Sequence, residues 1–107
     1  MSGAVKEIET VSEFQTETQT GVVLVDFFAT WCRPCQMQLP ILNEVAAKLG
    51  GQVKFLKVDT DKFSDLAQAY NVSSIPTLIV FKNGNAVERF TRVQEEDSLV
   101  STLQAQL

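Results

Sequence analysis

The chain contains 107 residues, of which 45% are apolar and 21% are charged, a composition typical of a single globular domain spanning residues 1–107. The net charge is -4 and there is no run of lysine or arginine, which argues against nucleic acid or an anionic membrane as a partner. The absence of histidine removes the commonest general base and metal ligand, and excludes every catalytic triad built on that residue.

The first seven residues contain neither a basic stretch nor an apolar stretch of the kind found in a signal peptide. The apolar runs elsewhere are too short to span a bilayer. We therefore expect a cytoplasmic protein, in which a disulfide is usually catalytic or transient. A mature chain from which a signal has been removed remains an alternative.

Strand and helix signals alternate in the first half of the chain. Residues 4–8 are a short strand candidate, and the capping-box spacing from Thr10 to Glu13 predicts a helix of about two turns. Residues 22–29 form a nearly continuous apolar run, which predicts a strand buried on both faces. A longer helix begins near Pro34 and ends at Gly50-Gly51. Its apolar face comprises Leu42, Val45, Ala46 and Leu49.

The second half continues the alternation and ends differently. Residues 53–58 predict a strand, and residues 63–70 a short helix with Asp61 or Ser64 as its cap. Strands at 77–81 and 86–91 flank Asn83-Gly84, a strong hairpin signal. A closing helix carries Leu99, Val100 and Leu103. This order predicts an α/β fold, with a mostly parallel sheet that is antiparallel at one end and helices on both faces.

The residues that carry chemistry are Trp31-Cys32-Arg33-Pro34-Cys35, which follow the buried strand at the edge where open sheets form their sites. Two residues separate the thiols, so the sulfurs can meet in one tight turn. Cys32 is expected at a helix N-terminus, where the positive end of the macrodipole favours the thiolate. We expect Cys32 to attack a substrate disulfide, and Cys35, one turn further in and more buried, to resolve the mixed disulfide.

Two other interpretations of the cysteine pair are weaker. A structural disulfide closing so short a loop would contribute only roughly 2 kcal/mol, and a reducing cytosol would keep it open. A metal site needs four ligands, so two cysteines without histidine would require dimerisation or an added thiol. We therefore predict a redox pair and no metal site.

Two charged residues interrupt the predicted buried strands. Asp26 lies within the apolar run of residues 22–29, where burial of an unpaired carboxylate should raise its pKa. Such a group near the dithiol could accept the proton of the resolving cysteine. Lys57 lies within the next strand, and we expect it to form an ion pair with Asp26 across neighbouring strands. The alternative is that one or both side chains lie on a solvated face.

Pro76 directly precedes a predicted strand. The pattern alone favours a proline that simply starts the strand. The other interpretation is a cis peptide bond that faces the cysteines and leaves the Ile75 backbone free to pair with a bound peptide.

Several separated motifs, running over essentially the whole chain, resemble the thioredoxin family. They are residues 25–35, Pro40, Ser74-Ile75-Pro76-Thr77 and Phe81-Lys82-Asn83-Gly84. The resemblance implies the thioredoxin fold, a central five-stranded mixed sheet flanked by four helices on both faces.

The resemblance also implies roles for individual residues. Cys32 would be the nucleophile of a protein-disulfide reductase and Cys35 the resolving thiol. Asp26 would be a buried proton acceptor with Lys57 beside it, Pro76 a cis-proline against the disulfide, and Trp31 a shield for the site.

The implied protein is a monomer that binds no cofactor. Its partners would be disulfide-containing proteins and a flavin-dependent thioredoxin reductase that supplies electrons from NADPH.

Three positions depart from the family pattern. Arg33 replaces the glycine of the usual Cys-Gly-Pro-Cys, Phe28 replaces a common tryptophan, and Arg92 replaces a common glycine in a loop beside the site. The two arginines would favour the Cys32 thiolate and could help dock substrates, together with Trp31, Ile75 and Pro76. They leave open a thioredoxin-like protein with a dedicated partner, an oxidase or isomerase role, and a binding subunit that needs no redox chemistry.

Overall fold

A computed structural model describes residues 4–107, in which strands and helices alternate along the chain. The strands are β1 (Val5–Glu7), β2 (Val22–Phe28), β3 (Val53–Asp59), β4 (Thr77–Lys82) and β5 (Asn85–Phe90). The helices are α1 (Val11–Thr18), α2 (Arg33–Leu49), α3 (Ser64–Ala69) and α4 (Glu96–Gln104). The predicted order of elements is confirmed, and each strand end lies within one residue of the expected position.

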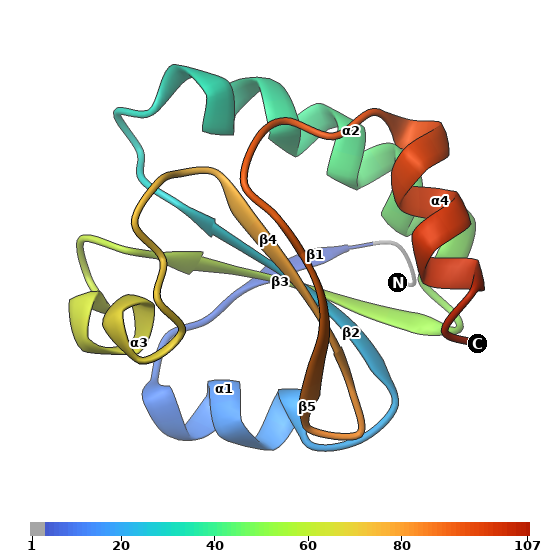
Figure 1. The fold of residues 1–107 in the computed structure, drawn as a ribbon, viewed down its shortest axis with the longest axis horizontal. Coiled ribbons are helices and arrows are strands. Elements are labelled where there is room, and N and C mark those ends of the chain that lie inside the picture. The colour runs from blue at the N-terminus through green and yellow to red at the C-terminus, as the bar shows by residue number, and fades with distance from the viewer. Residues whose placement is uncertain (1–3) are drawn as a thin grey trace.

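The strands form one mixed sheet in the order β1-β3-β2-β4-β5. β3 pairs in parallel with both β1 and β2, whereas β4 is antiparallel to β2 and to β5. Figure 1 shows α2 and α4 on one face of the sheet and α1 and α3 on the other. The predicted five-stranded mixed sheet flanked by four helices on both faces is therefore confirmed, and the structure adds that each face carries two of them. None of the helices within residues 4–107 is long and apolar enough to cross a membrane.

The sheet has a hydrophobic core on each face, and successive residues of strand β2 point alternately into one core and the other. Val23, Val25 and Phe27 belong to the core that packs against α1 and α3. Val22 and Leu24 belong to the core on the opposite face, beneath α2 and α4. Asp26 continues this second row, so the alternation of the strand places its carboxyl group under α2.

Helix α1 begins as the sequence predicts. The Thr10 Oγ1 atom accepts a hydrogen bond from the Glu13 backbone N–H at 3.0 Å. The Glu13 side chain accepts from the backbone N–H of Glu9 at 2.8 Å, one residue earlier than the capping-box pattern places this bond.

The predicted cap of helix α3 is wrong. Its N-cap is Phe63, which makes no side-chain capping bond, and Ser64 is already the first helical residue. The Asp61 carboxylate instead accepts a hydrogen bond from Trp31. Local spacing predicts that the Asp61 side chain caps α3, but in the structure this side chain binds Trp31, which lies 30 positions earlier in the sequence.

The predicted hairpin between β4 and β5 is confirmed. Asn83 and Gly84 have φ values of 50° and 87°, and positive φ at both central residues is what a type I′ turn requires. The Asn83 side chain also accepts a hydrogen bond from the Gly21 backbone N–H at 2.9 Å, which ties the turn to the start of β2.

Candidate active site

The Cys32–Cys35 pair lies between the carboxyl end of β2 and the N-terminus of α2, as the sequence predicts. The sulfurs are joined as a disulfide, and the two Cα atoms are 5.2 Å apart. Cys32 is the N-cap of α2, and its Sγ atom accepts a hydrogen bond from the Cys35 backbone N–H at 3.2 Å. An amide donor and a helix N-terminus at one sulfur both favour a thiolate there once the disulfide is reduced.

The two cysteines are equally covered, each with 4% of its surface exposed. The prediction that Cys35 is the more buried of the two is therefore wrong. Ile75 packs against the disulfide, and its carbonyl oxygen lies 3.8 Å from the Cys32 Sγ atom, so the loop before β4 covers the sulfur expected at the open end. The cysteines differ instead in their neighbours, because Cys35 lines a cavity beneath α2 that Cys32 does not line.

The Ile75–Pro76 peptide bond is cis, as the family resemblance implies. Pro76 is buried and Ile75 is half-buried, immediately before strand β4. The simpler interpretation, that Pro76 only starts the strand, is therefore incomplete. The loop before β4 contributes a wall to the disulfide site.

Trp31 lies on the outer side of the disulfide with 69% of its surface exposed. Its indole Nε1–H donates to the Asp61 carboxylate at 2.8 Å, and Asp59 in turn accepts from the Asp61 backbone N–H at 2.9 Å. The loop after β3 thus fixes the orientation of an exposed aromatic ring. Asp61 could not be predicted as a site residue, because no local spacing in the sequence connects it to Trp31.

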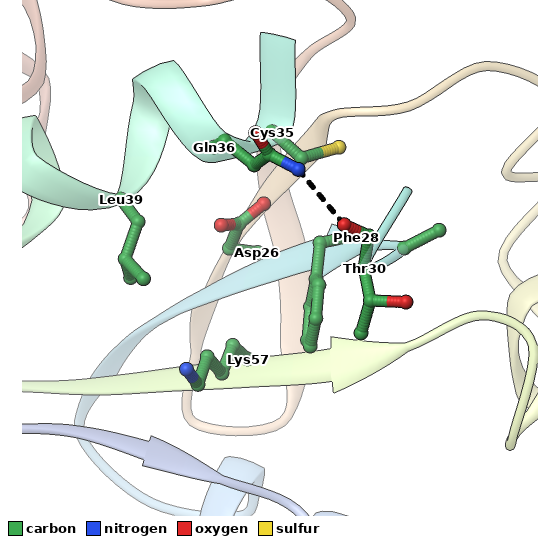
Figure 2. A pocket seen from close by; sticks show the side chains of 8 residues that line it. Asp26, Phe28, Thr30, Cys35, Gln36, Leu39 and Lys57 are labelled. Atoms are coloured by element: carbon green, nitrogen blue, oxygen red, sulfur yellow. Dashed lines mark hydrogen bonds between the residues drawn. The ribbon is translucent and has the colours of Figure 1, made fainter. Parts of the chain in front are cut away.

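A cavity of about 220 Å³ lies behind Cys35, between α2 and the sheet. Figure 2 shows the Asp26 carboxyl group directed into this space beneath the first turn of α2. A hydrogen bond of 2.9 Å from the Gln36 side chain to the Thr30 carbonyl oxygen joins α2 to the segment that follows β2. The lining consists of Asp26, Phe28, Ala29, Thr30, Cys35, Gln36, Leu39 and Lys57.

Asp26 is only 2% exposed, and its Oδ1 atom has no hydrogen-bond partner within the part of the chain that the structure describes. Burial raises the pKa of Asp26 from 3.8 to about 7, and the positive charge of Lys57 opposes this rise. The solvated alternative for Asp26 is wrong. A carboxyl group that ionises near neutral pH shares a cavity with Cys35, which is the arrangement a proton acceptor for that thiol needs.

Lys57 lies beside Asp26 in the sheet but does not form the predicted ion pair with it. The two residues are register partners on β3 and β2, yet among residues 4–107 the Lys57 amine is within ion-pair distance of Glu7 only, at 3.9 Å. The Lys57 Nζ atom also lies 5.5 Å from the centroid of the Phe28 ring. The strand register confirms that Asp26 and Lys57 are neighbours in the sheet. The predicted ion pair between them is wrong.

Comparison with known proteins shows the family of the chain. The family model for thioredoxin matches residues 5–105. The chain belongs to the thioredoxin family. A thioredoxin from Staphylococcus aureus is 44% identical over 98 residues, which cover 92% of this chain and 94% of that protein. A solved structure of a mutant thioredoxin from Halobacterium salinarum has a TM-score of 0.91 and 33% identity, covering 98% of this chain and 92% of that one.

A plant relative is longer. Chloroplastic thioredoxin Y from Oryza sativa subsp. japonica is 41% identical over 101 residues, which cover 92% of this thioredoxin but 60% of the rice protein. Thioredoxins are oxidoreductases of thiol–disulfide exchange that need no bound cofactor. The relatives support a protein-disulfide reductase over a binding subunit without redox chemistry. Within residues 4–107, no group of three or more potential ligands could hold a metal ion.

The two arginines that depart from the family pattern are both exposed in this thioredoxin. Arg33 is the first residue of α2, directly after Cys32, and Arg92 lies in the loop between β5 and α4. That loop is anchored to α2 by the buried side chain of Gln38, which donates to the Gln94 carbonyl oxygen at 3.1 Å and accepts from its N–H at 2.7 Å. The Arg92 loop is thus held one helical turn beyond Cys35.

Replacing Gln38 by leucine should lower the free energy of unfolding of this thioredoxin by about 1–3 kcal/mol. Leucine fills similar space but leaves the N–H and carbonyl groups of Gln94 without their partners. Urea unfolding of the oxidised protein measures the change. The exposed Gln36, replaced by leucine on the same helix, is the matched control. Equal losses in the two variants would contradict a special role for the buried amide.

Proposed function

We propose that this thioredoxin is a general protein-disulfide reductase in which Cys32 attacks and Cys35 resolves. The observation that carries the assignment is the disulfide at the N-terminus of α2 with a buried carboxyl group behind its second sulfur. The amide donor to Sγ of Cys32 supports this thiol as the nucleophile. The cavity shared by Cys35 and Asp26 supports Cys35 as the thiol that gives up a proton later.

The proposed reaction has two exchange steps. The Cys32 thiolate attacks one sulfur of the substrate disulfide, so that a mixed disulfide forms and the other substrate sulfur leaves as a thiolate. The Cys35 thiol then passes its proton to the Asp26 carboxylate and attacks the Cys32 sulfur. The Cys32–Cys35 disulfide forms, the second substrate sulfur leaves, and two electrons have passed to the substrate.

The proposed docking surface surrounds the covered disulfide. It comprises Trp31, Ile75, Pro76 and Arg92, and Pro34 supports it by fixing the first turn of α2. The exposure of Trp31 and the wall formed by the loop before β4 support this assignment. Arg33 and Arg92 add positive charge to a protein whose net charge is -4, which favours partners with acidic residues beside their disulfide.

The proposed electron donor is a thioredoxin reductase that uses NADPH, since family members usually have such a partner. We further propose that residues 1–107 act as a single monomeric domain in the cytoplasm. A redox-active rather than structural disulfide suits a reducing compartment. The chloroplastic rice relative shows that location varies within the family.

NADPH-coupled reduction of insulin in the presence of a thioredoxin reductase tests this function. The expected result is NADPH oxidation that depends on both proteins and continues over many turnovers. Failure with several reductases, although the chemically reduced protein still reduces insulin, would contradict a general reductase and indicate a dedicated electron donor.

Replacing Arg33 by glycine should make the protein slightly more reducing. The exposed positive charge beside Cys32 stabilises its thiolate and hence the reduced form, which raises the potential of the parent by about 10 mV. Equilibration of both proteins with glutathione, followed by separation of oxidised and reduced forms, measures the difference. An equal or lower potential for the parent would contradict the proposed effect of the Arg33 charge on the dithiol.

A further inference from the structure

Three charged residues form one row across the sheet. Glu7 on β1 is the register partner of Lys57 on β3, and Lys57 is the register partner of Asp26 on β2. In each of the three strands, the residue two positions earlier packs in the core beneath α2 and α4. Because side chains two positions apart in a strand lie on the same face, all three charged residues belong to that face of the sheet. One ammonium group therefore lies between two carboxyl groups, one at the rim of the sheet and one in its interior.

Lys57 is directed toward the outer carboxylate of this row. Its Nζ atom lies 3.9 Å from the Glu7 Oε1 atom, and no comparable contact with Asp26 occurs within residues 4–107. The other oxygen of Glu7, Oε2, lies 3.9 Å from the amine of Lys62, so Glu7 bridges two lysines. The side chains of Lys57 and Glu7 are 23% and 39% exposed, which leaves both within reach of solvent.

The inner carboxyl group correspondingly forms no ion pair with any residue of the described range 4–107. From α2, the disulfide-bonded Cys35 lines the same cavity as Asp26, and the register partner of Asp26 on β4 is the apolar Leu78. Asp59, further along β3, accepts a hydrogen bond from the Asp61 backbone N–H. Lys57 thus lines the same cavity as Asp26, but its ammonium group lies near the Glu7 carboxylate at the rim of the sheet.

We propose that Glu7 is a positioning residue for the proton-transfer step, because it holds the Lys57 ammonium group at the rim and leaves the Asp26 carboxyl group unpaired beside Cys35. The link to Cys35 rests on the proposed function, whereas the competition between the two carboxyl groups for Lys57 does not. Without Glu7, the flexible lysine side chain is free to turn inward and stabilise ionised Asp26. Glu7 thereby sets the pH range in which Asp26 exchanges its proton.

The test is the titration of Asp26 in the oxidised protein, followed by the carbon NMR signal of its carboxyl group. In the Glu7→Gln variant the pKa of Asp26 should fall from about 7 to about 6 or lower, because a cation moves within a few ångströms of the carboxylate. Glu9→Gln is the matched control, since it removes an exposed acidic side chain two residues further along and should leave the titration unchanged.

A second variant separates positioning from a direct effect of the Glu7 charge. If Glu7 acts through Lys57, adding Glu7→Gln to Lys57→Met should not move the Asp26 titration any further. The proposal is overturned by an unchanged pKa in the single variant, or by an equal fall when Lys57 is absent. Because the oxidised protein is titrated without a substrate, these results are independent of whether it reduces insulin.

Discussion

Replacing Cys32 by serine is expected to lower the rate of disulfide reduction by at least about 10³-fold, because a serine hydroxyl is not ionised at neutral pH and cannot form the mixed disulfide. Replacing Cys35 by serine should abolish turnover in a different way. Cys32 still attacks, but the mixed disulfide with the substrate accumulates. Insulin turnover measures the rate, and mass spectrometry under non-reducing conditions detects the adduct.

Serine is a suitable replacement at position 32, because it is a good N-cap and can still accept the hydrogen bond from the Cys35 backbone N–H. Loss of activity will therefore not reflect a lost helix cap. The variant with both cysteines replaced should still bind a partner if the chain is a binding subunit. Accumulation of adduct in the Cys32→Ser variant rather than the Cys35→Ser variant would reverse the assigned roles.

Replacing Asp26 by asparagine is expected to raise the free energy of unfolding by about 4 kcal/mol at pH 8. Each pKa unit corresponds to about 1.4 kcal/mol, and burial raises the pKa of this carboxyl group from 3.8 to about 7. Between these values the folded protein holds a proton that the unfolded chain has released. Stability of the parent therefore falls as pH rises from about 4 to about 7, and asparagine removes this loss.

Chemical unfolding of the oxidised parent and the Asp26→Asn variant at several pH values measures this difference. The two stabilities should converge near pH 4 and diverge up to about pH 8. Glu88→Gln, which removes an exposed carboxylate on strand β5, is the control. A difference that is the same at every pH would mean that packing, and not ionisation, separates the two proteins.

Much of the site could be predicted because its parts depend on local sequence. The apolar run of residues 22–29 predicts a buried strand, and the two-residue period then places Asp26 on one face and Phe27 on the other. The spacing of Cys32 and Cys35 at the start of a helical pattern predicts a thiol at the helix N-terminus. The cis bond at Pro76 came from the family resemblance, because the pattern alone favoured a simple strand start.

The contacts that could not be predicted join elements distant in sequence. Asp61 has the spacing of a helix cap, but it binds Trp31 from the other side of the site. Lys57 has two carboxyl neighbours in the sheet, and its choice of Glu7 depends on the direction of a flexible side chain. Local patterns indicate which residues are buried or aligned, whereas the partner of each polar group depends on the packed structure.

The most direct test of the central claim is a single turnover with chemically reduced protein and excess insulin. Each chain should reduce one disulfide, and the Cys32–Cys35 disulfide should form at the same rate as substrate thiols appear. If both thiols are present and accessible to alkylation, but no electrons pass to insulin, this thioredoxin is not a protein-disulfide reductase.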